Sequence, residues 1–332
     1  MAVAAAAPRK RPAPEGPCSA ACGGGGTKRP RYKFGSIYDY EKLGALGEGT
    51  YGVVVEARDR RTGEAVAIKW VRGPDGGAPD LRAVVREAGC HAACRGHPSV
   101  VEIRDVVADE ASGDLFLVME LVGPSLRTRL TRPFSEPETR GLMRQLLRGA
   151  EKIHATGTIH RDIKPENVLV GPGGALKICD FGMATPVRPP YTEKRVGSLW
   201  YNSPEQLMGS RCYGTAVDVW ALGCVMFELL TGETLFEEVD TEDDMLVAVL
   251  DLWHDMKEAG LGAFKGLPEL SQAGGEVLCG LLCFEEDDRL TAAAALQHRW
   301  FAEDAEAESP AAAGDEHHAF VVSSTEPQSS SS

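Results

Sequence analysis

The sequence contains no hydrophobic run long enough to cross a membrane. Its longest apolar stretch near the middle, residues 221–230, is about half of the roughly 20 residues that a spanning helix needs. The N-terminus also lacks the charged-then-apolar pattern and the cleavage site of a secretory signal. We therefore expect neither secretion nor membrane spanning, and we expect a location in the nucleus, the cytoplasm or both.

The chain also lacks a net positive charge. It carries 49 acidic against 35 basic residues, for a formal net charge of −14. Non-specific binding of nucleic acid needs a basic surface that contacts phosphates, so direct nucleic-acid binding is not expected. No internal repeat of about 20 to 50 residues is visible, which argues against a repeat architecture.

The nine cysteines give little sign of disulfides, because their number is odd and no signal peptide is evident. Cys90, His91, Cys94 and His97 could be interpreted as metal ligands, but zinc sites usually have two tight ligand pairs. We favour the other interpretation, in which the cysteines are small apolar side chains on helix faces.

The two ends of the chain differ from its middle in composition. The first 33 residues hold seven Lys and Arg against one acid, whereas residues 302–332 hold seven acids and no Lys or Arg. Neither end shows a periodic apolar face, so residues 1–36 and 302–332 are predicted to be disordered tails. The basic clusters at 9–11 and 28–31 fit a two-part nuclear import signal or, alternatively, solvated tail charge.

Residues 37–301 are predicted to form the folded domain. Short β-branched or apolar runs at 51–56, 65–71 and 114–122 predict strands. After Pro124 the spacing becomes helical, and helices are predicted over 137–154, with Ser135 or Glu136 near its start, 215–230 and 291–300. This order predicts an α+β fold with two lobes. A small β-rich N-lobe would span 37–120, a hinge 121–125 and a larger helical C-lobe 126–301, with a crevice at the hinge.

A glycine-rich segment, Gly47-Glu48-Gly49-Thr50-Tyr51-Gly52, precedes the strand-like run Val53-Val54-Val55. A dinucleotide-binding fold would place a helix after such glycines, so a dinucleotide-binding oxidoreductase is not favoured. Glycines that join two strands can instead form a flap whose backbone N–H groups lie over phosphates. Lys69, at the end of the next apolar run, would then be a point charge for phosphate oxygens, and Glu87 could hold it in place.

A second constellation is His160-Arg161-Asp162-Ile163-Lys164-Pro165-Glu166-Asn167, followed by Asp180-Phe181-Gly182. Asp162 can accept the proton of an incoming hydroxyl, and Lys164 can neutralise charge on a transferring phosphoryl group. Asn167 and Asp180 offer hard oxygen ligands of the kind that Mg²⁺ prefers. Together with the flap and Lys69, these residues predict phosphoryl transfer that uses ATP and Mg²⁺.

These motifs resemble those of the eukaryotic protein kinases over residues 40–301, and Lys164 indicates the serine/threonine type. The closest resemblance is to the cyclin-dependent kinases. It rests on the flap at 47–54, on Tyr191-Thr192 ahead of Leu199-Trp200-Tyr201, and on Asp218-Val219-Trp220-Ala221-Leu222-Gly223-Cys224. The alanine- and glycine-rich tails around this core resemble the plant F-type group. Roles in the cell cycle or in phosphorylating the RNA polymerase II C-terminal domain are implied by the family alone.

The resemblance implies a role for each matching residue. Lys69 would hold the α and β phosphates and pair with Glu87, Asp162 would be the catalytic base, and Met119 would stand behind the adenine. Asn167 and Asp180 would bind Mg²⁺. Ser203-Pro204-Glu205 would close the activation segment, with Glu205 paired to Arg289. Asp218 would steady the catalytic loop, which is the motif at 160–167. The residues implied in ATP binding are Leu46, Gly47, Glu48, Gly49, Thr50, Tyr51, Gly52, Val53, Val54, Lys69, Glu120 and Val122.

The resemblance also implies phosphorylation sites. Thr192 matches the site of an upstream activating kinase, and Arg86 and Arg161 match two of the arginines that capture its phosphate. Thr185 stands where the family has a third arginine, so Arg188 or Arg195 would substitute or the switch is weaker. Thr50 and Tyr51 match inhibitory sites, where a phosphate would crowd ATP.

Several positions depart from the family. The helix that faces cyclin keeps only Arg86-Glu87 of its signature, and Gly89 costs it roughly 1 kcal/mol relative to alanine. A cyclin partner and independence of cyclin therefore both stay open. His91 replaces an apolar core residue, and we predict a packed histidine, with a pH sensor as the alternative.

Two further departures concern substrate choice. Asn202 replaces an arginine that helps to select proline after the target residue, so proline-directed specificity is not implied. The stretch from 231 to 280 is shorter than in the family and acidic, which fits a solvated face or, alternatively, attraction of basic substrates. A pseudokinase scaffold is the main alternative function. The intact set of Lys69, Glu87, Asp162, Asn167 and Asp180 favours an active kinase that acts on protein substrates.

Overall fold

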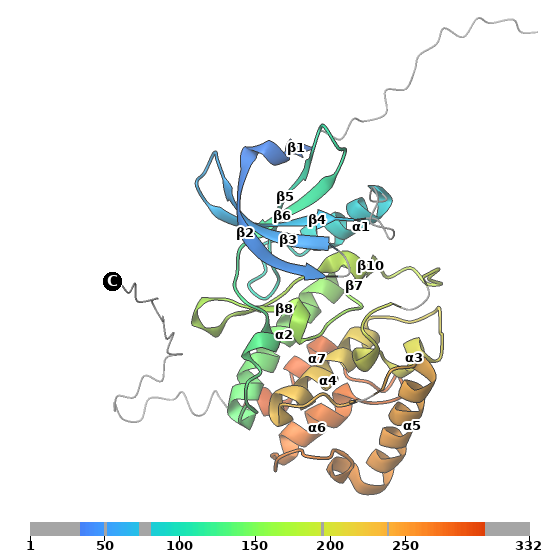
Figure 1. Cartoon of the computed structure of the whole chain (residues 1–332). Coiled ribbons are helices and arrows are strands. Elements are labelled where there is room, and N and C mark those ends of the chain that lie inside the picture. The colour runs from blue at the N-terminus through green and yellow to red at the C-terminus, as the bar shows by residue number, and fades with distance from the viewer. Residues whose placement is uncertain (1–33, 50–51, 73–80, 194–195, 238, 303–332) are drawn as a thin grey trace, which may run out of the picture. The chain divides into compact units, whose positions relative to one another are not determined.

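The computed structural model describes residues 34–49, 52–72, 81–193, 196–237 and 239–302. Both predicted tails lie almost wholly outside these residues, as do Thr50, Tyr51 and Arg195. The described chain has a β-sheet in its first part and a helical second part, as the sequence predicted (Figure 1).

The first part is a six-stranded sheet in the order β1-β5-β6-β4-β3-β2. Its neighbouring strands are antiparallel, except that β1 and β5 pair in parallel. The predicted strand at 65–71 coincides with β4, and the one at 114–122 corresponds to β6. The strands are β1 (Gly35–Ser36), β2 (Tyr40–Gly49), β3 (Gly52–Asp59), β4 (Ala65–Val71), β5 (Ile103–Ala108) and β6 (Leu115–Glu120).

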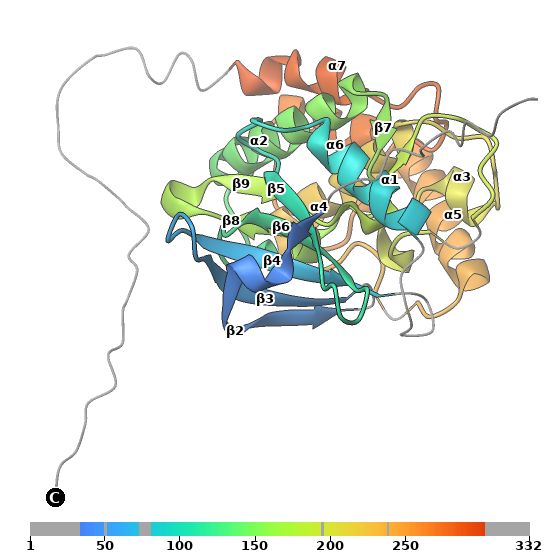
Figure 2. The same ribbon diagram turned by 90° about the horizontal axis from the view of Figure 1, so that it is seen from above.

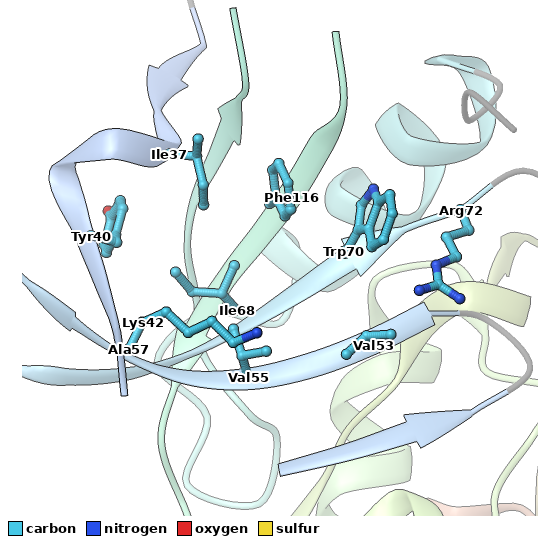
Figure 3. A pocket seen from close by; sticks show the side chains of 10 residues that line it. All are labelled: Ile37, Tyr40, Lys42, Val53, Val55, Ala57, Ile68, Trp70, Arg72 and Phe116. Carbon is cyan, nitrogen blue, oxygen red and sulfur yellow. The ribbon is translucent and has the colours of Figure 1, made fainter. Parts of the chain in front are cut away.

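The register of β3 against β4 assigns their side chains to two faces of the sheet. Val53 is opposite Trp70, and Val54 is opposite Lys69. Because successive side chains of a strand alternate in direction, these two pairs point to opposite faces. Val53 and Trp70 line an apolar pocket of about 340 Å³ together with Phe116, as Figure 3 shows. Val54 and Lys69 therefore share the other face, which is the one that could meet a nucleotide.

Helix α1 (Leu81–Ala92) packs its buried Val84 against Ile103 and Leu117 of the sheet. It also contacts the short helix η5 (Phe181–Met183) and β10 (Thr185–Pro186) of the second part, and Figure 1 shows it between the sheet and the labels of β10 and of β7 (Thr158–Ile159). Figure 2 shows the same helix from above. Its position therefore controls how side chains from the two parts meet.

The second part is built around helices α2 (Glu136–Ala155) and α4 (Ala216–Thr231). Ser135 caps α2 in a reciprocal capping box with Glu138, as the predicted helix start near Ser135 required. The apolar stretch at 221–230 makes up most of α4 and is buried against α2 and α6 (Gln272–Leu281). Among the described residues no helix combines the length and the apolar character that crossing a membrane requires.

The other helices are α3 (Pro204–Leu207), α5 (Glu242–Ala259), α6 (Gln272–Leu281) and α7 (Ala292–Leu296). Short strands form two pairs, β7 (Thr158–Ile159) with β10 (Thr185–Pro186) and β8 (Val168–Val170) with β9 (Leu176–Ile178). The 3₁₀ helices are η1 (Ile37–Asp39), η2 (Leu126–Arg129), η3 (Pro165–Asn167), η4 (Pro172–Gly174), η5 (Phe181–Met183), η6 (Leu199–Tyr201), η7 (Gly260–Ala263) and η8 (Arg299–Phe301).

The single helix predicted over 291–300 is wrong, because α7 ends at Leu296 and η8 follows it. His298 interrupts the helix, since its side chain caps η8 by accepting a hydrogen bond from the backbone N–H of Trp300. The break lets the buried Trp300 donate its Nε1–H to Glu136 on α2, at 2.6 Å.

Candidate active site

Lys69 is the centre of a buried charge cluster. Its Nζ lies 2.7 Å from Oε1 of Glu87 and 2.7 Å from Oδ1 of Asp180. Burial alone would lower the pKa of Lys69, but the carboxylates of Asp180 and Glu87 raise it above its ordinary value. Burial likewise opposes the ionisation of Asp180, and Lys69 outweighs it and lowers the pKa of that carboxyl. The predicted Lys69–Glu87 pair is thus formed, and Asp180 joins it.

His91 fixes the helix that carries Glu87. Its ring is buried and stacks on Phe181, with centroids 4.5 Å apart and planes 8° from parallel. Its Nε2–H donates to the carbonyl of Val101 at 2.5 Å. Phe181 in turn contacts the ring of His160 edge-on at 5.0 Å. The predicted packed histidine is confirmed, and it links α1 to both the Asp180 segment and the catalytic loop.

The catalytic loop holds Asp162 between two donors. Its Oδ2 accepts a hydrogen bond from Nδ2 of Asn167 at 2.7 Å, and its Oδ1 accepts one from the hydroxyl of Ser198 at 2.8 Å. Lys164 lies 3.2 Å from Asp162 and donates to Ser198 at 2.5 Å. Both oxygens are therefore oriented before any substrate arrives. The sequence reasoning missed Ser198, although a hydroxyl just ahead of Leu199-Trp200-Tyr201 was a visible signal.

Asn167 connects this loop to the Asp180 segment, because its carbonyl accepts a hydrogen bond from the backbone N–H of Cys179 at 2.9 Å. Its side-chain NH₂ is used on Asp162, which leaves the amide Oδ1 as a hard oxygen donor. Asp180 supplies a second, partly exposed carboxylate. This donor set suits Mg²⁺, which favours a few protein oxygens together with phosphate oxygens.

Asp218, on α4, stabilises the catalytic loop through hydrogen bonds to its backbone. It is buried, and it accepts hydrogen bonds at 2.8 Å from the backbone N–H groups of His160 and Arg161 and at 2.9 Å from Nε2 of His154. Burial opposes its charge, but the bond from His154 and the neighbouring donors lower its pKa. These contacts hold Arg161 in a left-handed conformation, with a φ of 67°.

Glu205 and Arg289 form a buried bidentate pair, with N–O distances of 2.8 and 3.0 Å. Arg289 also donates to the carbonyls of Cys283, Phe284 and Ala216. The pair implied by the resemblance is present, and it ties the end of the activation segment to the loop before α7.

Of the flap, the structure describes β2 up to Gly49 and β3 from Gly52. A Cβ at Gly52 would lie 2.0 Å from the carbonyl oxygen of Trp70, and its φ is 143°, so this position requires glycine. Leu46 is exposed at the end of β2. The prediction for Val53 needs correction, because its side chain lines the apolar pocket (Figure 3). The strand register places Lys69 on the opposite face of the sheet. The prediction can therefore apply only to the backbone of Val53.

The end of β6 carries the residues expected at the adenine. Met119 is buried, and the backbone N–H of Glu120 donates a hydrogen bond to the carbonyl of Glu102. The carbonyl of Glu120 is therefore the backbone group that it could offer to a base. Its side chain is held away by Lys177, whose Nζ lies 2.6 Å from Oε1.

A cluster around Arg127 escaped the sequence reasoning. Arg127 donates to Glu166 at 2.6 Å, to Tyr201 at 2.8 Å and to the buried Glu228. Tyr201 donates to the other oxygen of Glu228 at 2.8 Å. Burial raises the pKa of Glu228, while Tyr201 and Arg127 counteract it. Glu228 lies inside the apolar stretch of α4, where nothing in the sequence marks its partners.

Thr192 is exposed, and the two predicted phosphate-binding arginines contact its neighbour Glu193. Thr185 is buried in β10, and Arg188 is exposed. In the cysteine and histidine quartet at 90–97, Cys90 and Cys94 pack in the apolar core, His91 stacks on Phe181, and His97 accepts a hydrogen bond from the backbone N–H of Ser99. No group of three or more His, Cys, Asp or Glu side chains suited to a metal occurs within the described ranges.

Comparison with known families agrees with this arrangement. The family described as "Protein kinase domain" matches residues 40–301, which is most of the chain. The chain belongs to the protein kinase family. Its similarity to cyclin-dependent kinases makes it a cyclin-dependent-kinase-like serine/threonine kinase by homology.

Three curated relatives illustrate this similarity. The kinase is 46% identical over 298 residues to "Putative cyclin-dependent kinase F-2" of Oryza sativa subsp. japonica, covering 80% of this chain and 90% of that protein. It is 37% identical over 305 residues to cyclin-dependent kinase G-2 of Oryza sativa subsp. indica, covering 81% of this chain and 42% of that protein. It is 36% identical over 308 residues to cyclin-dependent kinase G1 of Arabidopsis thaliana, covering 81% of this chain and 50% of that protein. The chain thus spans half or less of the two G-type relatives.

Proposed function

We propose that this kinase, through a domain spanning 37–301, transfers the γ-phosphoryl group of ATP to serine and threonine hydroxyls of protein substrates. The observation that carries the proposal is the joint placement of Lys69, Glu87 and Asp180 beside an Asp162 already oriented by two hydrogen bonds. No comparable feature favours a scaffold without turnover, because all five residues of the catalytic set are present.

Each step of the reaction draws on a side chain of the chain itself. Lys69, kept charged by two carboxylates, attracts the α and β phosphates. Asp162 receives the proton of the substrate hydroxyl, because Asn167 and Ser198 hold its two oxygens in place. Lys164, next to Asp162, offsets the negative charge on the phosphoryl group during its transfer. Asn167 Oδ1 and Asp180 would hold Mg²⁺, which neutralises charge on the phosphate oxygens.

We further propose that an upstream kinase can phosphorylate Thr192, since its side chain is exposed. A partner can dock beside α1, where Leu81 and Val85 are exposed next to a groove of about 1000 Å³. A cyclin is the partner class that the family suggests for this surface. The Lys69–Glu87 pair is nevertheless formed within this one chain. We also propose that the kinase is located in the nucleus, the cytoplasm or both.

The experiment is a kinase assay on an arrayed peptide library, with and without candidate cyclins, combined with a measurement of ATP binding. We expect transfer to serine or threonine peptides, and the array also reports cyclin dependence and proline preference. ATP binding without transfer under every condition would favour the pseudokinase scaffold.

A further inference from the structure

Glu193 occupies the position that a phosphate on Thr192 would be expected to take. Its Oε1 lies 2.9 Å from Nη1 of Arg86 and 3.6 Å from Nη2 of Arg161. The sequence predicted that both arginines bind a phosphate on Thr192. In the unmodified chain they already contact the carboxylate of Glu193.

Arg161 is a buried cation whose charge this carboxylate balances. The exposed fraction of its side chain is 1%, and a guanidinium cannot shed its proton when buried. Its other contacts are neutral: Nε donates to the carbonyl of Met183 at 2.7 Å, and Nη1 donates to the hydroxyl of Tyr213 at 3.2 Å. Within the described residues, the carboxylate paired with Arg161 is that of Glu193. A buried cation without a counter-ion is strongly unfavourable, so this pair matters for the local structure.

The ionisation of Glu193 suits this task. Burial opposes its charge, yet its own backbone N–H and the two arginines lower its pKa below the ordinary value. The side chain is about one-third exposed, so it stays ionised at neutral pH while it touches both arginines.

The contacts join three elements that must meet for catalysis. Arg86 precedes Glu87 on α1, Arg161 precedes Asp162 in the catalytic loop, and Glu193 lies in the activation segment. One carboxylate therefore draws the helix that holds Glu87 toward the loop that holds Asp162.

We propose that Glu193 is a positioning residue, a resident anion that assembles the catalytic arrangement without phosphorylation of Thr192. This inference rests on the proposed kinase activity and specifies its regulation. A phosphate on Thr192 would compete with Glu193 for the same two arginines, so it adds little to the activity of the wild-type kinase. Arg86 Nε is buried with no acceptor among the described residues, and a phosphate could supply one.

The test compares the wild type, Glu193→Gln, Glu193→Asp and Thr192→Ala, each produced without phosphate on Thr192 as checked by mass spectrometry. We expect the unphosphorylated wild type and Thr192→Ala to be equally active. We expect Glu193→Gln to lose on the order of tenfold in kcat, because it loses a partly exposed ion pair with Arg86 and a longer one with the buried Arg161, and we expect Glu193→Asp to retain more activity than Glu193→Gln. Glu258→Gln, an exposed acid on α5, is the matched control and keeps full activity.

The response of activity to phosphorylation of Thr192 distinguishes a positioning role of Glu193 from a merely structural one. Treatment with an activating kinase should restore Glu193→Gln to near wild-type activity and change the wild type less than about threefold, since one anion replaces the other. The double variant Thr192→Ala, Glu193→Gln should not recover. A wild type that is inactive until Thr192 is phosphorylated would overturn the inference and leave the kinase function standing. Equal activity of unphosphorylated wild type and Glu193→Gln would overturn it as well.

A second measurement does not depend on activity. The backbone N–H of Tyr191 donates to the carbonyl of Arg211, so its hydrogen exchange reports whether the activation segment is docked. We expect faster exchange at Tyr191 in Glu193→Gln than in the wild type. If no form of the protein transfers phosphate, the proposed function fails, and this exchange alone decides the inference. Unchanged exchange would overturn it.

Discussion

His91 provides a prediction whose size follows from its surroundings. Burial of its ring against Phe181 lowers the pKa of His91 from 6.5 to about 4, although the carbonyl of Val101 and the neighbouring Asp180 favour the charged form. Between these two values the unfolded chain binds a proton that the folded chain excludes. The free energy of unfolding must therefore fall as the pH drops through this window. From the two pKa values, the fall between pH 7 and pH 5 is about 2 kcal/mol.

The perturbation is His91→Leu, which restores an apolar side chain at this position. The variant loses the hydrogen bond to Val101 at every pH, so its absolute stability is not the diagnostic quantity. We expect it to lose about 2 kcal/mol less than the wild type when the pH changes from 7 to 5. The assay is urea-induced unfolding, followed by tryptophan fluorescence, at both pH values.

A matched substitution, His254→Gln, removes a histidine that is exposed on α5 and should follow the wild-type pH dependence. The reasoning fails if wild type and His91→Leu lose the same free energy between pH 7 and pH 5. It also fails if an NMR titration of the His91 ring gives a pKa near 6.5.

Two further predictions concern the ion pairs of two buried carboxylates. Arg289→Met leaves Glu205 buried without its partner and should lower the free energy of unfolding by about 3–5 kcal/mol in chemical denaturation, whereas Arg299→Met, in an exposed pair, should cost less than about 1 kcal/mol. Equal losses would contradict the assigned burial. Arg127→Met should leave Glu228 with a still higher pKa, so the penalty should be larger at pH 8 than at pH 5, where the carboxyl can take up a proton. A penalty that does not change with pH would show that Arg127 does not balance Glu228.

The sequence was informative where chemistry imposes residue types at fixed spacing. Asp162, Asn167 and Asp180 come together because the β8–β9 hairpin between Asn167 and Asp180 returns the chain to Asn167, so their spacing along the chain carries most of the geometry. Ser135 was recognisable as a helix start for the same reason, since a cap acts within three residues.

Partners that are distant along the chain could not be predicted in this way. Arg127 and Glu228 are separated by 101 residues, and only the tertiary fold, which packs η2 against η3 and η6 against α4, brings them together. Glu193 is different, because an acid directly after a predicted phosphosite was visible, and only its contacts with Arg86 and Arg161 reveal its importance. The side chain of Val53 was misplaced although alternation along the strand alone would have put it on the face opposite Val54.

The most direct test of the central claim is the rate of phosphate transfer to serine or threonine peptides by the wild type and by Asp162→Asn, with ATP binding measured on the same samples. We expect both proteins to bind ATP with Mg²⁺, and we expect the variant to transfer phosphate about 10²- to 10⁴-fold more slowly, as the loss of a general base implies. Equal rates in the two proteins would contradict the assignment of Asp162, and ATP binding without any transfer by the wild type would contradict the kinase activity itself.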